Sequence, residues 1–278
     1  MLQIKYFMAV ARSENISRAA QEFMVPPSSV SVAIKKLEAD WGYPLFDRTA
    51  NRLKLNTNGK LFLHALEIAE REMRNAKMQM QNLAGTVSGE IRLLILSNRR
   101  NVMQCISSFK AAYPHVAFTI RHEWHQNYMD YDLIVTDRIL SEEVFERHLY
   151  QHEEMLLAVP KNHPLALCES VSLSALGREK FICMPKGSSL GDYTHAAFSR
   201  FGISPEIAIE CDDPEYILMY LKMGLGLSLF PNRSWGSQVD ENIHLIKLEG
   251  NLERDSYVYL RKNASVAAKQ FAKTLAEA

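Results

Sequence analysis

The chain has 278 residues, and its 32 lysine and arginine residues balance its 32 aspartate and glutamate residues. Its length exceeds that of a usual single domain and predicts two or three units. No apolar run approaches the roughly 18 residues that a membrane-spanning helix needs, and the four cysteines (Cys105, Cys168, Cys183 and Cys211) form no CxxC pair. The first feature argues against a membrane-spanning protein, and the scattered cysteines fit a reducing cytoplasm better than a disulfide framework.

The charge is distributed unevenly along the chain. Residues 1–60 contain nine lysine or arginine residues against five aspartate or glutamate residues, which leaves +4 there and −4 in the remainder. A basic end on an acidic body is expected where only that end contacts nucleic acid. The first residues are helix-periodic through Ile4, Phe7, Met8 and Ala11, so we interpret them as the first helix of a domain and not as a signal peptide.

Residues 15–41 predict two short helices with a tight turn between them. Ser17 is expected to cap the first helix, because its hydroxyl can accept a free N–H of the opening turn. The turn at 24–26 precedes Pro27, which suits the first position of the second helix, where no N–H donor is needed.

The second helix of this pair has two different faces. Its apolar positions follow helical spacing and predict a buried face made of Val30, Ile34, Leu37 and Trp41. The opposite face is small, hydroxylated and basic around Val32, a composition that suits a DNA major groove. The alternative is an ordinary helical hairpin with a solvated polar face. The residues expected to contact DNA from these helices are Ser17, Arg18, Pro27, Ser28, Ser29, Ser31, Val32, Lys35 and Lys36.

The sequence after Trp41 favours the DNA-binding interpretation. Two short extended runs, 44–47 and 52–56, flank a polar tip, and Leu45 and Phe46 can anchor the resulting ribbon. Helices followed by such a ribbon predict a winged helix-turn-helix. The ribbon residues expected to point outward toward DNA are Arg48, Arg52 and Lys54.

The runs SRAAQEF and VSVAIKKLEADWGYPLFDRT, followed by LNTNG, resemble the amino-terminal signature of the LysR-type transcriptional regulators. The resemblance covers essentially the whole chain and is densest in the first sixty residues. It implies a sequence-specific DNA-binding regulator that is controlled by a small effector. One departure concerns the opening of the recognition helix, where the family has a Ser-Gln-Pro-like run whose glutamine contacts DNA. Here those positions hold Pro26, Pro27 and Ser28, so the family's base preference does not carry over.

Residues 57–84 predict one long helix without proline. Its apolar residues recur at alternating spacings of four and three, the pattern of a coiled coil. In the resembling family this is the linker helix, which pairs with its copy in a homodimer or homotetramer; the alternative is a helix packed on its own body. The residues expected at the dimer contact are Phe62, Leu66, Ala69, Met73, Ala76, Met80 and Leu83.

After a small-residue hinge at 85–89, strand-like runs alternate with helical ones, which is typical of parallel sheets with helical crossovers. This half resembles the family's effector domain, in which two α/β subdomains are hinged by two crossing strands, as in a periplasmic binding protein. YP at 113–114, HPLA at 163–166 and GLGLSLFP at 224–231 are its landmarks. The expected strands are 91–96, 115–124, 132–137, 153–160, 181–185, 206–211, 226–231, 244–248 and 256–262.

The predicted fold is therefore multidomain: an amino-terminal, mainly α-helical winged helix-turn-helix, a long linker helix, and an α/β effector domain. We assign residues 1–58 to the DNA-binding domain, 59–88 to the linker and hinge, and 89–278 to the effector domain. Within the effector domain, subdomain I is expected at about 89–161 plus 263–278, and subdomain II at about 162–262.

Ligands of open α/β sheets bind at the carboxyl ends of strands, near helix amino termini. Applied to the expected strands, that rule selects four places, which coincide with the places where the resembling family binds its inducers. Hydroxyls, backbone donors and an arginine in one cleft suggest an anionic metabolite; the alternative is that the two arginines are merely solvated. The expected effector-binding residues are Ser97, Asn98, Arg99, Arg100, Thr136, Gly187, Ser188, Ser189, Phe230 and Pro231.

Other functions have weaker support. No P-loop, GxSxG, HExxH or dinucleotide fingerprint occurs, so we expect neither an enzyme nor a cofactor. His122 with His125, or His148 with His152, lack a third metal ligand at useful spacing. A free-standing solute-binding protein would carry no winged helix. The alternative that stays open is a regulator of the same architecture that responds to oxidation of its cysteines.

Overall fold

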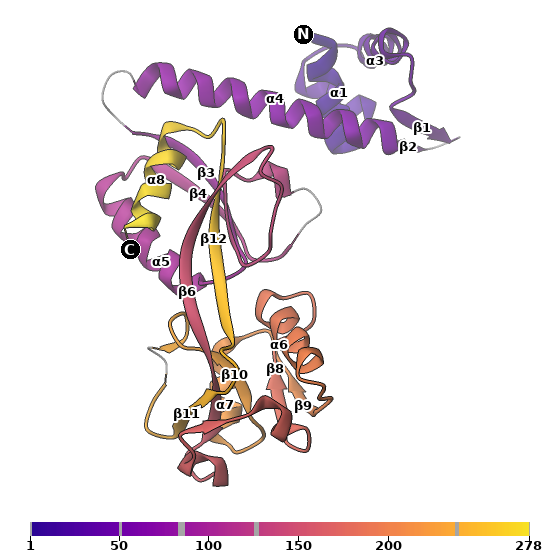
Figure 1. The fold of residues 1–278 in the computed structure, drawn as a ribbon. Coiled ribbons are helices and arrows are strands. Elements are labelled where there is room, and N and C mark those ends of the chain that lie inside the picture. The colour runs from indigo at the N-terminus through magenta and orange to yellow at the C-terminus, as the bar shows by residue number, and fades with distance from the viewer. Residues whose placement is uncertain (1, 50–51, 83–86, 125–127, 237–238, 278) are drawn as a thin grey trace. The chain divides into compact units, whose positions relative to one another are not determined.

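The computed structural model describes residues 2–49, 52–82, 87–124, 128–236 and 239–277, and it forms two compact units, Met1–Lys77 and Met78–Ala278. Within those described ranges, every helix is too short or too polar to cross a membrane. The elements of the first unit (Figure 1) are α1 (Leu2–Ser13), α2 (Ile16–Glu22), α3 (Pro27–Trp41), β1 (Phe46–Thr49), β2 (Arg52–Leu55) and α4 (Thr57–Asn82), which continues into the second unit.

The first unit is the predicted winged helix-turn-helix. Phe7 of α1 and Val30 and Ile34 of α3 are at most 1% exposed and form its core. β1 and β2 pair in antiparallel register, and the Phe46 ring of β1 lies 5.6 Å from the Phe7 ring. Trp41, expected on the buried face, is 56% exposed, because it lies in the last turn of α3, where its ring contacts that of Phe62.

The cap of α2 differs from the prediction. Asn15 is the capping residue, and its side chain accepts a hydrogen bond of 3.0 Å from the N–H of Arg18. Ser17 lies inside the helix, exposed to solvent. The prediction was wrong by two residues because asparagine caps a helix at least as well as serine. Pro27 does occupy the first position of α3, as expected.

A hydrogen bond and a close backbone approach fix the wing against the helices. The Glu38 carboxylate of α3 accepts the N–H of Leu45 at 2.9 Å, just before β1. At the start of α4, a Cβ on Gly59 would lie 2.1 Å from the carbonyl oxygen of Leu45, so only glycine allows this close approach of helix and wing.

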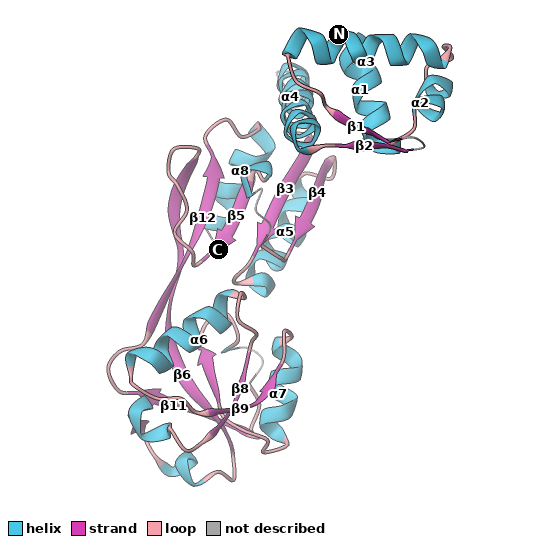
Figure 2. Cartoon of the chain, turned by 90° about the vertical axis from the view of Figure 1, so that its right-hand side faces the viewer, coloured by secondary structure: helices cyan, strands magenta, loops and turns pink. Residues whose placement is uncertain are grey.

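The second unit has two α/β lobes joined by two long strands, β6 (Phe145–Pro160) and β12 (Glu253–Arg261). These strands pair in antiparallel register from Glu253 opposite Glu154 to Arg261 opposite Phe145. Figures 1 and 2 show both strands running from one lobe to the other. They are the two crossing strands that the sequence analysis expected.

In the first lobe, β3 pairs in parallel with β4 and β5, and β12 closes that sheet in antiparallel register. Its core surrounds Phe109 and Phe271, whose rings lie 5.1 Å apart. The elements of this lobe are β3 (Gly89–Ile95), α5 (Arg99–Ala112), β4 (Val116–Arg121), η1 (Tyr128–Asp130), β5 (Leu133–Thr136) and α8 (Val266–Ala276).

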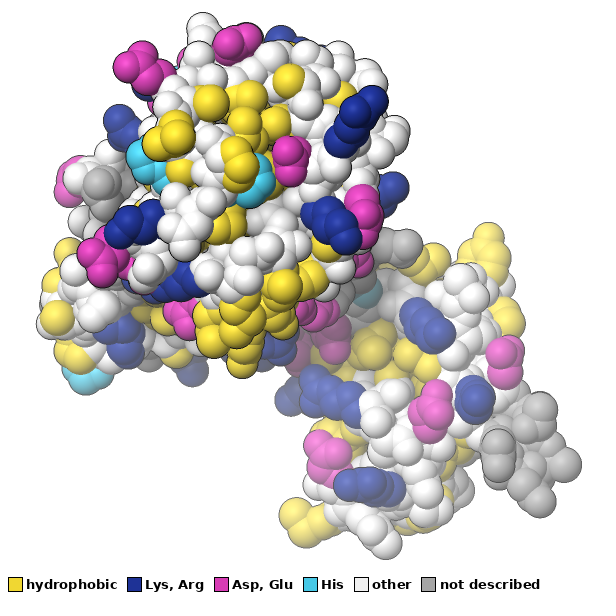
Figure 3. Space-filling model, turned by 90° about the horizontal axis from the view of Figure 1, so that it is seen from below, with side chains coloured by type: hydrophobic (Ala, Val, Ile, Leu, Met, Phe, Trp, Pro, Cys, Tyr) yellow, Lys and Arg dark blue, Asp and Glu magenta, His cyan; other side chains and the backbone are white. Residues whose placement is uncertain are grey.

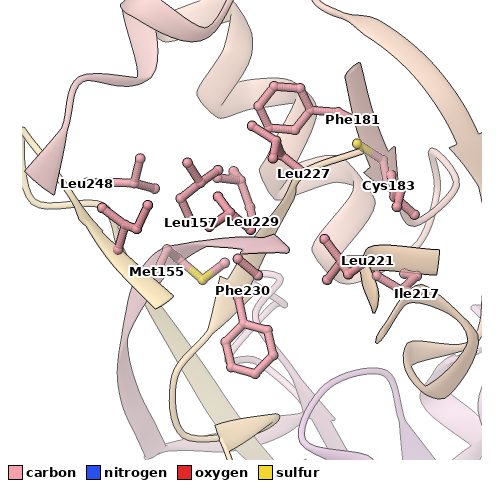
Figure 4. Packing of buried hydrophobic residues seen from close by; sticks show 14 of the residues in the cluster. Met155, Leu157, Phe181, Cys183, Ile217, Leu221, Leu227, Leu229, Phe230 and Leu248 are labelled. Carbon is pink, nitrogen blue, oxygen red and sulfur yellow. The ribbon is translucent and has the colours of Figure 1, made fainter. Parts of the chain in front are cut away.

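In the second lobe, β6 pairs with β10 and β11, and β8 pairs in parallel with β9. Figure 4 shows its core, in which side chains from these strands meet those of α7. The elements of this lobe are η2 (Pro164–Leu167), β7 (Ser170–Val171), η3 (Leu173–Leu176), β8 (Lys180–Cys183), α6 (Ser189–Arg200), β9 (Glu206–Glu210), α7 (Pro214–Lys222), β10 (Ser228–Pro231) and β11 (Ile243–Leu248).

Both long strands pass from one lobe to the other at lower residue numbers than we expected. On β6, the core of the second lobe already includes Met155. On β12, the core of the first lobe already includes Val258 and Leu260. We expected these crossings near 161 and 262. Only the apolar second half of β6 was recognised as a strand, because its first half (FERHLYQH) is polar and largely exposed.

Candidate functional site

The predicted DNA-contacting surface is largely solvent-exposed. Val32 is 66% exposed on α3, and Ser31 beside it is half-buried. Met24, in the turn before α3, is 92% exposed and has a φ of 54°. Arg48 and Arg52 lie in β1 and β2, but their side chains are outside the described part of the chain. The remaining predicted contacts are all exposed: Ser17, Arg18, Pro27, Ser28, Ser29, Lys35, Lys36 and Lys54.

The predicted dimer seam on α4 is divided into two parts. Phe62 and Leu66 are half-buried against the core of the winged helix-turn-helix, and the Phe62 ring lies 5.1 Å from that of Phe7. Farther along, Met73 and Met80 are 59% and 71% exposed. Ala69 before Met73 and Ala76 between the two methionines are also exposed, and Leu83 is outside the described residues. The first two seam residues therefore pack within the chain, and the later ones leave an apolar stripe uncovered.

A cavity of about 700 Å³ lies between the two lobes of the second unit. We call it the cleft. The first turns of three helices line it: Asn98–Arg100 at α5, Ser188–Leu190 at α6, and Asp213–Glu215 at α7. Free backbone N–H groups at helix amino termini favour anions, so the cleft has three such sources of positive potential.

At the start of α5, buried polar groups lack partners. Ser97 and Asn98 are each 5% exposed and line the cleft. Neither the Ser97 hydroxyl nor either amide atom of Asn98 has a hydrogen-bond partner. Leaving a buried donor or acceptor unpaired costs about 1–3 kcal/mol. Asn98 also adopts a left-handed conformation, with φ of 54°. These unpaired groups distinguish this end of the cleft from the starts of α6 and α7.

At the start of α6, the protein supplies its own anion. Asp192, in the first turn, accepts hydrogen bonds from the Gly187 N–H at 2.7 Å and from Arg138 at 2.9 Å. Arg138 also donates to the Gly187 carbonyl and lies over the Trp124 ring, 5.0 Å from its centroid. Because Arg138 follows β5 in the first lobe, this ion pair joins the two lobes across the cleft.

The floor of the cleft holds a buried ion pair. Arg254 of β12 is 5% exposed and lies 2.6 Å from the carboxylate of Glu153 of β6, which is 1% exposed. The same carboxylate accepts the N–H and hydroxyl of Ser234. Arg254 also lies 3.5 Å from the Ser189 hydroxyl. Breaking a buried pair of this kind costs several kcal/mol, so it fixes the geometry of the strands that line the cleft.

The start of α7 is acidic. Asp213 caps the helix by accepting the Glu215 N–H at 2.8 Å, and Asp212 and Asp213 both line the cleft. Glu215 lies 3.5 Å from Arg100 of α5, a second ion pair between the lobes. On the α5 side, His122 lies 3.2 Å from the Ile95 carbonyl. Burial lowers the pKa of His122, which favours its neutral form.

The structure brings seven of the ten predicted effector-binding residues together in the cleft and leaves three outside its lining. Thr136 is fully buried, and its hydroxyl accepts the N–H of Arg138. Phe230 packs in the core of the second lobe (Figure 4), and Pro231 pairs with Met155 of β6. Successive side chains of a strand point to opposite faces, so the position of a strand end does not tell which of its side chains face the cleft. Cleft residues that the sequence analysis missed are His122, Trp124, Arg138, Asp212, Asp213, Glu215, Trp235 and Arg254.

The cysteines do not favour a thiol-based signal. Cys105 and Cys183 lie in the cores of different lobes. Burial raises the pKa of both, that of Cys183 to about 12, so neither forms the reactive thiolate at neutral pH. Cys211 follows β9 near Cys183, and Cys168 is exposed. In the described ranges, no cluster of three potential metal ligands occurs.

Comparison with known families matches both units. Residues 1–60 match the model of the bacterial regulatory helix-turn-helix proteins of the lysR family, and residues 84–278 match the LysR substrate binding domain. The chain is 28% identical over 239 residues to the uncharacterized HTH-type transcriptional regulator YybE of Bacillus subtilis, covering 83% of this chain and 82% of YybE.

Solved structures share the fold. Full-length CbnR in complex with its target DNA is similar with a TM-score of 0.66 and 20% identity, covering 99% of this chain and 98% of CbnR. The regulatory domain of CcmR from Synechocystis PCC6803, in complex with 2-PG, has a TM-score of 0.61 and 19% identity. That comparison covers 68% of this chain and 97% of the CcmR domain.

Proposed function

The chain belongs to the LysR family of bacterial transcriptional regulators, and from that premise we propose that a small effector with an anionic group binds at the α5 end of the cleft. Binding there controls how α3 holds DNA. The observation that carries this proposal is the set of unpaired groups on Ser97 and Asn98, both buried and both lining the cleft. The related CcmR regulatory domain is described in complex with 2-PG, which supports a small-molecule ligand for a domain of this fold.

DNA recognition is assigned to the exposed face of α3. Ser28 and Ser29 at its start can donate to phosphates and base edges, and the methyl groups of Val32 suit contact with a thymine methyl. CbnR, which shares the fold, is described with its target DNA. The protein then acts in the cytoplasm, where its DNA lies. Affinity should fall steeply with added salt, because each phosphate contact releases counterions.

The uncovered stripe on α4 is assigned to a second copy of the chain. Ala69 and Ala76 allow close helix approach, and Met73 and Met80 supply adaptable apolar contact. Replacing both methionines with aspartate places charges in adjacent layers of the dimer contact and should yield monomers. A double variant that still sediments as a dimer would contradict this assignment.

Effector and DNA are coupled through the lobe angle. The cleft lies between lobes joined by β6 and β12, and the ion pairs Arg138–Asp192 and Arg100–Glu215 join its two sides. A ligand that contacts both lobes favours one angle over another, and it shifts the equilibrium only by its difference in affinity for the two states. A coupling of about 1–3 kcal/mol is enough to change the arrangement of two DNA-bound copies.

The experiment is operator footprinting with the full chain. Operator fragments are first selected from genomic DNA with the purified protein, and the footprint is then compared with and without a small-molecule cell extract. Ser97→Ala should keep the footprint without extract and lose the change that the extract causes. Ser256→Ala is the matched control, because the Ser256 hydroxyl is also buried and unpaired but lies outside the cleft lining. An extract response that survives in Ser97→Ala would overturn the proposal, and so would a response that Ser256→Ala loses equally, because the loss would then not be specific to the cleft.

A further inference from the structure

We propose that the effector is an α-amino acid, whose carboxylate binds at the start of α5 and whose ammonium group faces Asp212 and Asp213 at the start of α7. This inference rests on the proposed function, because it names the chemical class that the cleft takes. It goes beyond an anionic effector, since it requires a cationic group next to the anionic one.

The first argument comes from the amide of Asn98. Its oxygen needs a donor and its nitrogen needs an acceptor, and both atoms lack partners in a residue that is 5% exposed. Exchanging the two amide atoms would not change this conclusion, because one donor and one acceptor remain unpaired in either orientation. A ligand made only of carboxylates can satisfy the nitrogen but not the oxygen. An amino acid carries a donor and an acceptor on neighbouring atoms and can satisfy both.

The second argument comes from the charges that surround the start of α5. α5 has no acidic residue in its first turn, so its N–H groups and the nearby Arg99 favour a carboxylate. Across the cleft, the start of α7 carries Asp212 and Asp213, and the Arg100–Glu215 pair, at 3.5 Å, brings the two helix starts close together. A ligand between them meets a positive end and a negative end at short separation. That pattern matches a zwitterion.

The remaining lining suits the side chain of an amino acid. Trp124, Trp235 and Leu190 give the cleft apolar walls, and polar atoms complete its surface. A simple amine would leave the Asn98 nitrogen and the α5 N–H groups unpaired. A dicarboxylate would place negative charge beside Asp212 and Asp213, which costs binding energy. An α-hydroxy acid supplies a neutral donor in place of the ammonium, so it is the analogue that separates charge from hydrogen bonding.

The experiment measures binding of the twenty proteinogenic L-amino acids to the full chain by thermal shift, followed by calorimetry on the strongest binder. That amino acid is then compared with its deaminated acid, its α-hydroxy acid and its decarboxylated amine. The deaminated acid and the amine should each bind at least about tenfold more weakly, because each loses a charge-assisted hydrogen bond. The α-hydroxy acid should fall between the amino acid and the deaminated acid.

Two variants test the assigned contacts. Asn98→Gly removes the side-chain amide while allowing the positive φ, and it should weaken binding of the amino acid at least about tenfold. Asp213→Asn keeps a good cap for α7 but removes its charge. It should weaken binding of the amino acid and leave the affinity for the deaminated acid unchanged or higher. Ser256→Ala, outside the cleft, should bind the amino acid like the wild type.

The outcomes separate the two proposals. If deaminated acids bind as tightly as amino acids and Asn98→Gly weakens both, the cleft takes an anion and the amino-acid inference is overturned. The amino-acid inference also fails if no amino acid binds while the cell extract still changes the wild-type footprint through Ser97. If neither amino acids nor extract act on the wild type, the proposed function falls as well.

Discussion

The helices α5 and α6 both begin at the cleft, and they differ in whether the polar groups at their starts have hydrogen-bond partners. In α6, Asp192 of the same helix accepts the Gly187 N–H and the Arg138 guanidinium. In α5, no acidic residue lies in the first turn, and the Ser97 and Asn98 side chains have no partners. One helix start therefore holds an anion that the chain itself supplies, and the other holds none.

The sequence position of a helix start therefore does not identify a ligand site. Helix starts attract anions in general, but a carboxylate in the first turn competes with any ligand. Charge alone is similarly uninformative, because basic and acidic side chains are interspersed over the second lobe as Figure 3 shows it from below. The state of the neighbouring polar groups, paired or unpaired, distinguishes the two ends of the cleft.

The largest effect should come from making α5 resemble α6. Asn98→Asp places a carboxylate at the start of α5, where it repels the carboxylate of the effector. Effector affinity should fall at least about 100-fold, the scale of an unpaired buried charge. The free energy of unfolding should fall as well, because the carboxylate lies unpaired in a residue that is 5% exposed and makes no cap hydrogen bond. Thermal unfolding with and without effector measures both quantities, and a variant that still responds like the wild type would contradict the comparison.

A smaller effect should come from making α6 resemble α5. Asp192→Asn frees the charge of Arg138, so the variant should bind sulfate more tightly, by up to about fivefold for a partly exposed pair. Sulfate titrations followed by thermal shift measure the change. Glu142→Gln, which removes a partly exposed ion pair with Arg147 away from the cleft, is the control. Equal sulfate binding by wild type and Asp192→Asn would show that the α6 start is not filled by its own carboxylate.

The pH dependence of stability should sharpen the comparison on the α5 side. Burial lowers the pKa of His122 below the ordinary 6.5. As the pH falls, His122 is therefore protonated in the unfolded chain before it is protonated in the folded one. The contribution of His122 to the free energy of unfolding is therefore fully present above about pH 6.5 and falls as the pH drops below that value. Urea unfolding at pH 7 and pH 5.5 should show a smaller loss in His122→Gln than in wild type. Identical losses would count against a buried, neutral His122.

The smallest effect concerns the thiols near the two helices. Cys105 lies in α5 and Cys183 ends the strand before α6, and burial raises the pKa of both. Alkylation at pH 8 should therefore modify the exposed Cys168 quickly and these two slowly, as measured by mass spectrometry. Effector should not alter their rates by more than about twofold, since neither lines the cleft. Rapid modification of Cys183 together with a changed footprint would instead favour the thiol-responsive regulator.

Much of this organisation is predictable from local sequence, and the cleft only in part. The winged helix-turn-helix follows from helical periodicity and from Pro27 at the start of the second helix, and both effects are local. Asn98 and Ser188 follow from strand ends, which also are local. Arg254 was missed because it reaches the cleft through the pairing of β12 with β6, which sets it opposite Glu153, 101 positions away. Arg138 was missed because Thr136 was selected at the same strand end, whereas Thr136 is buried and the residue two positions later lines the cleft. Phe230 was wrongly selected, because its strand end faces the core.

The first half of β6 shows the same limit. Its polar residues do not follow an apolar alternation, and the strand exists because β12 pairs with it along the hinge. Nor does the sequence reveal that Asp192 fills its own helix start. An acidic residue in a first turn is common, and only the contacts with Gly187 and Arg138 give it this role.

The most direct test of the central claim is hydrogen exchange of the full chain with and without the small-molecule extract. Backbone amides of the first α5 turn, within residues 97–104, are compared with those of the α6 turn, within residues 187–194. We predict that the extract protects the α5 segment and leaves the α6 segment almost unchanged in wild type, and that this protection is absent in Asn98→Asp. Protection of the α6 segment alone, or of α5 in Asn98→Asp to the wild-type extent, would contradict the account.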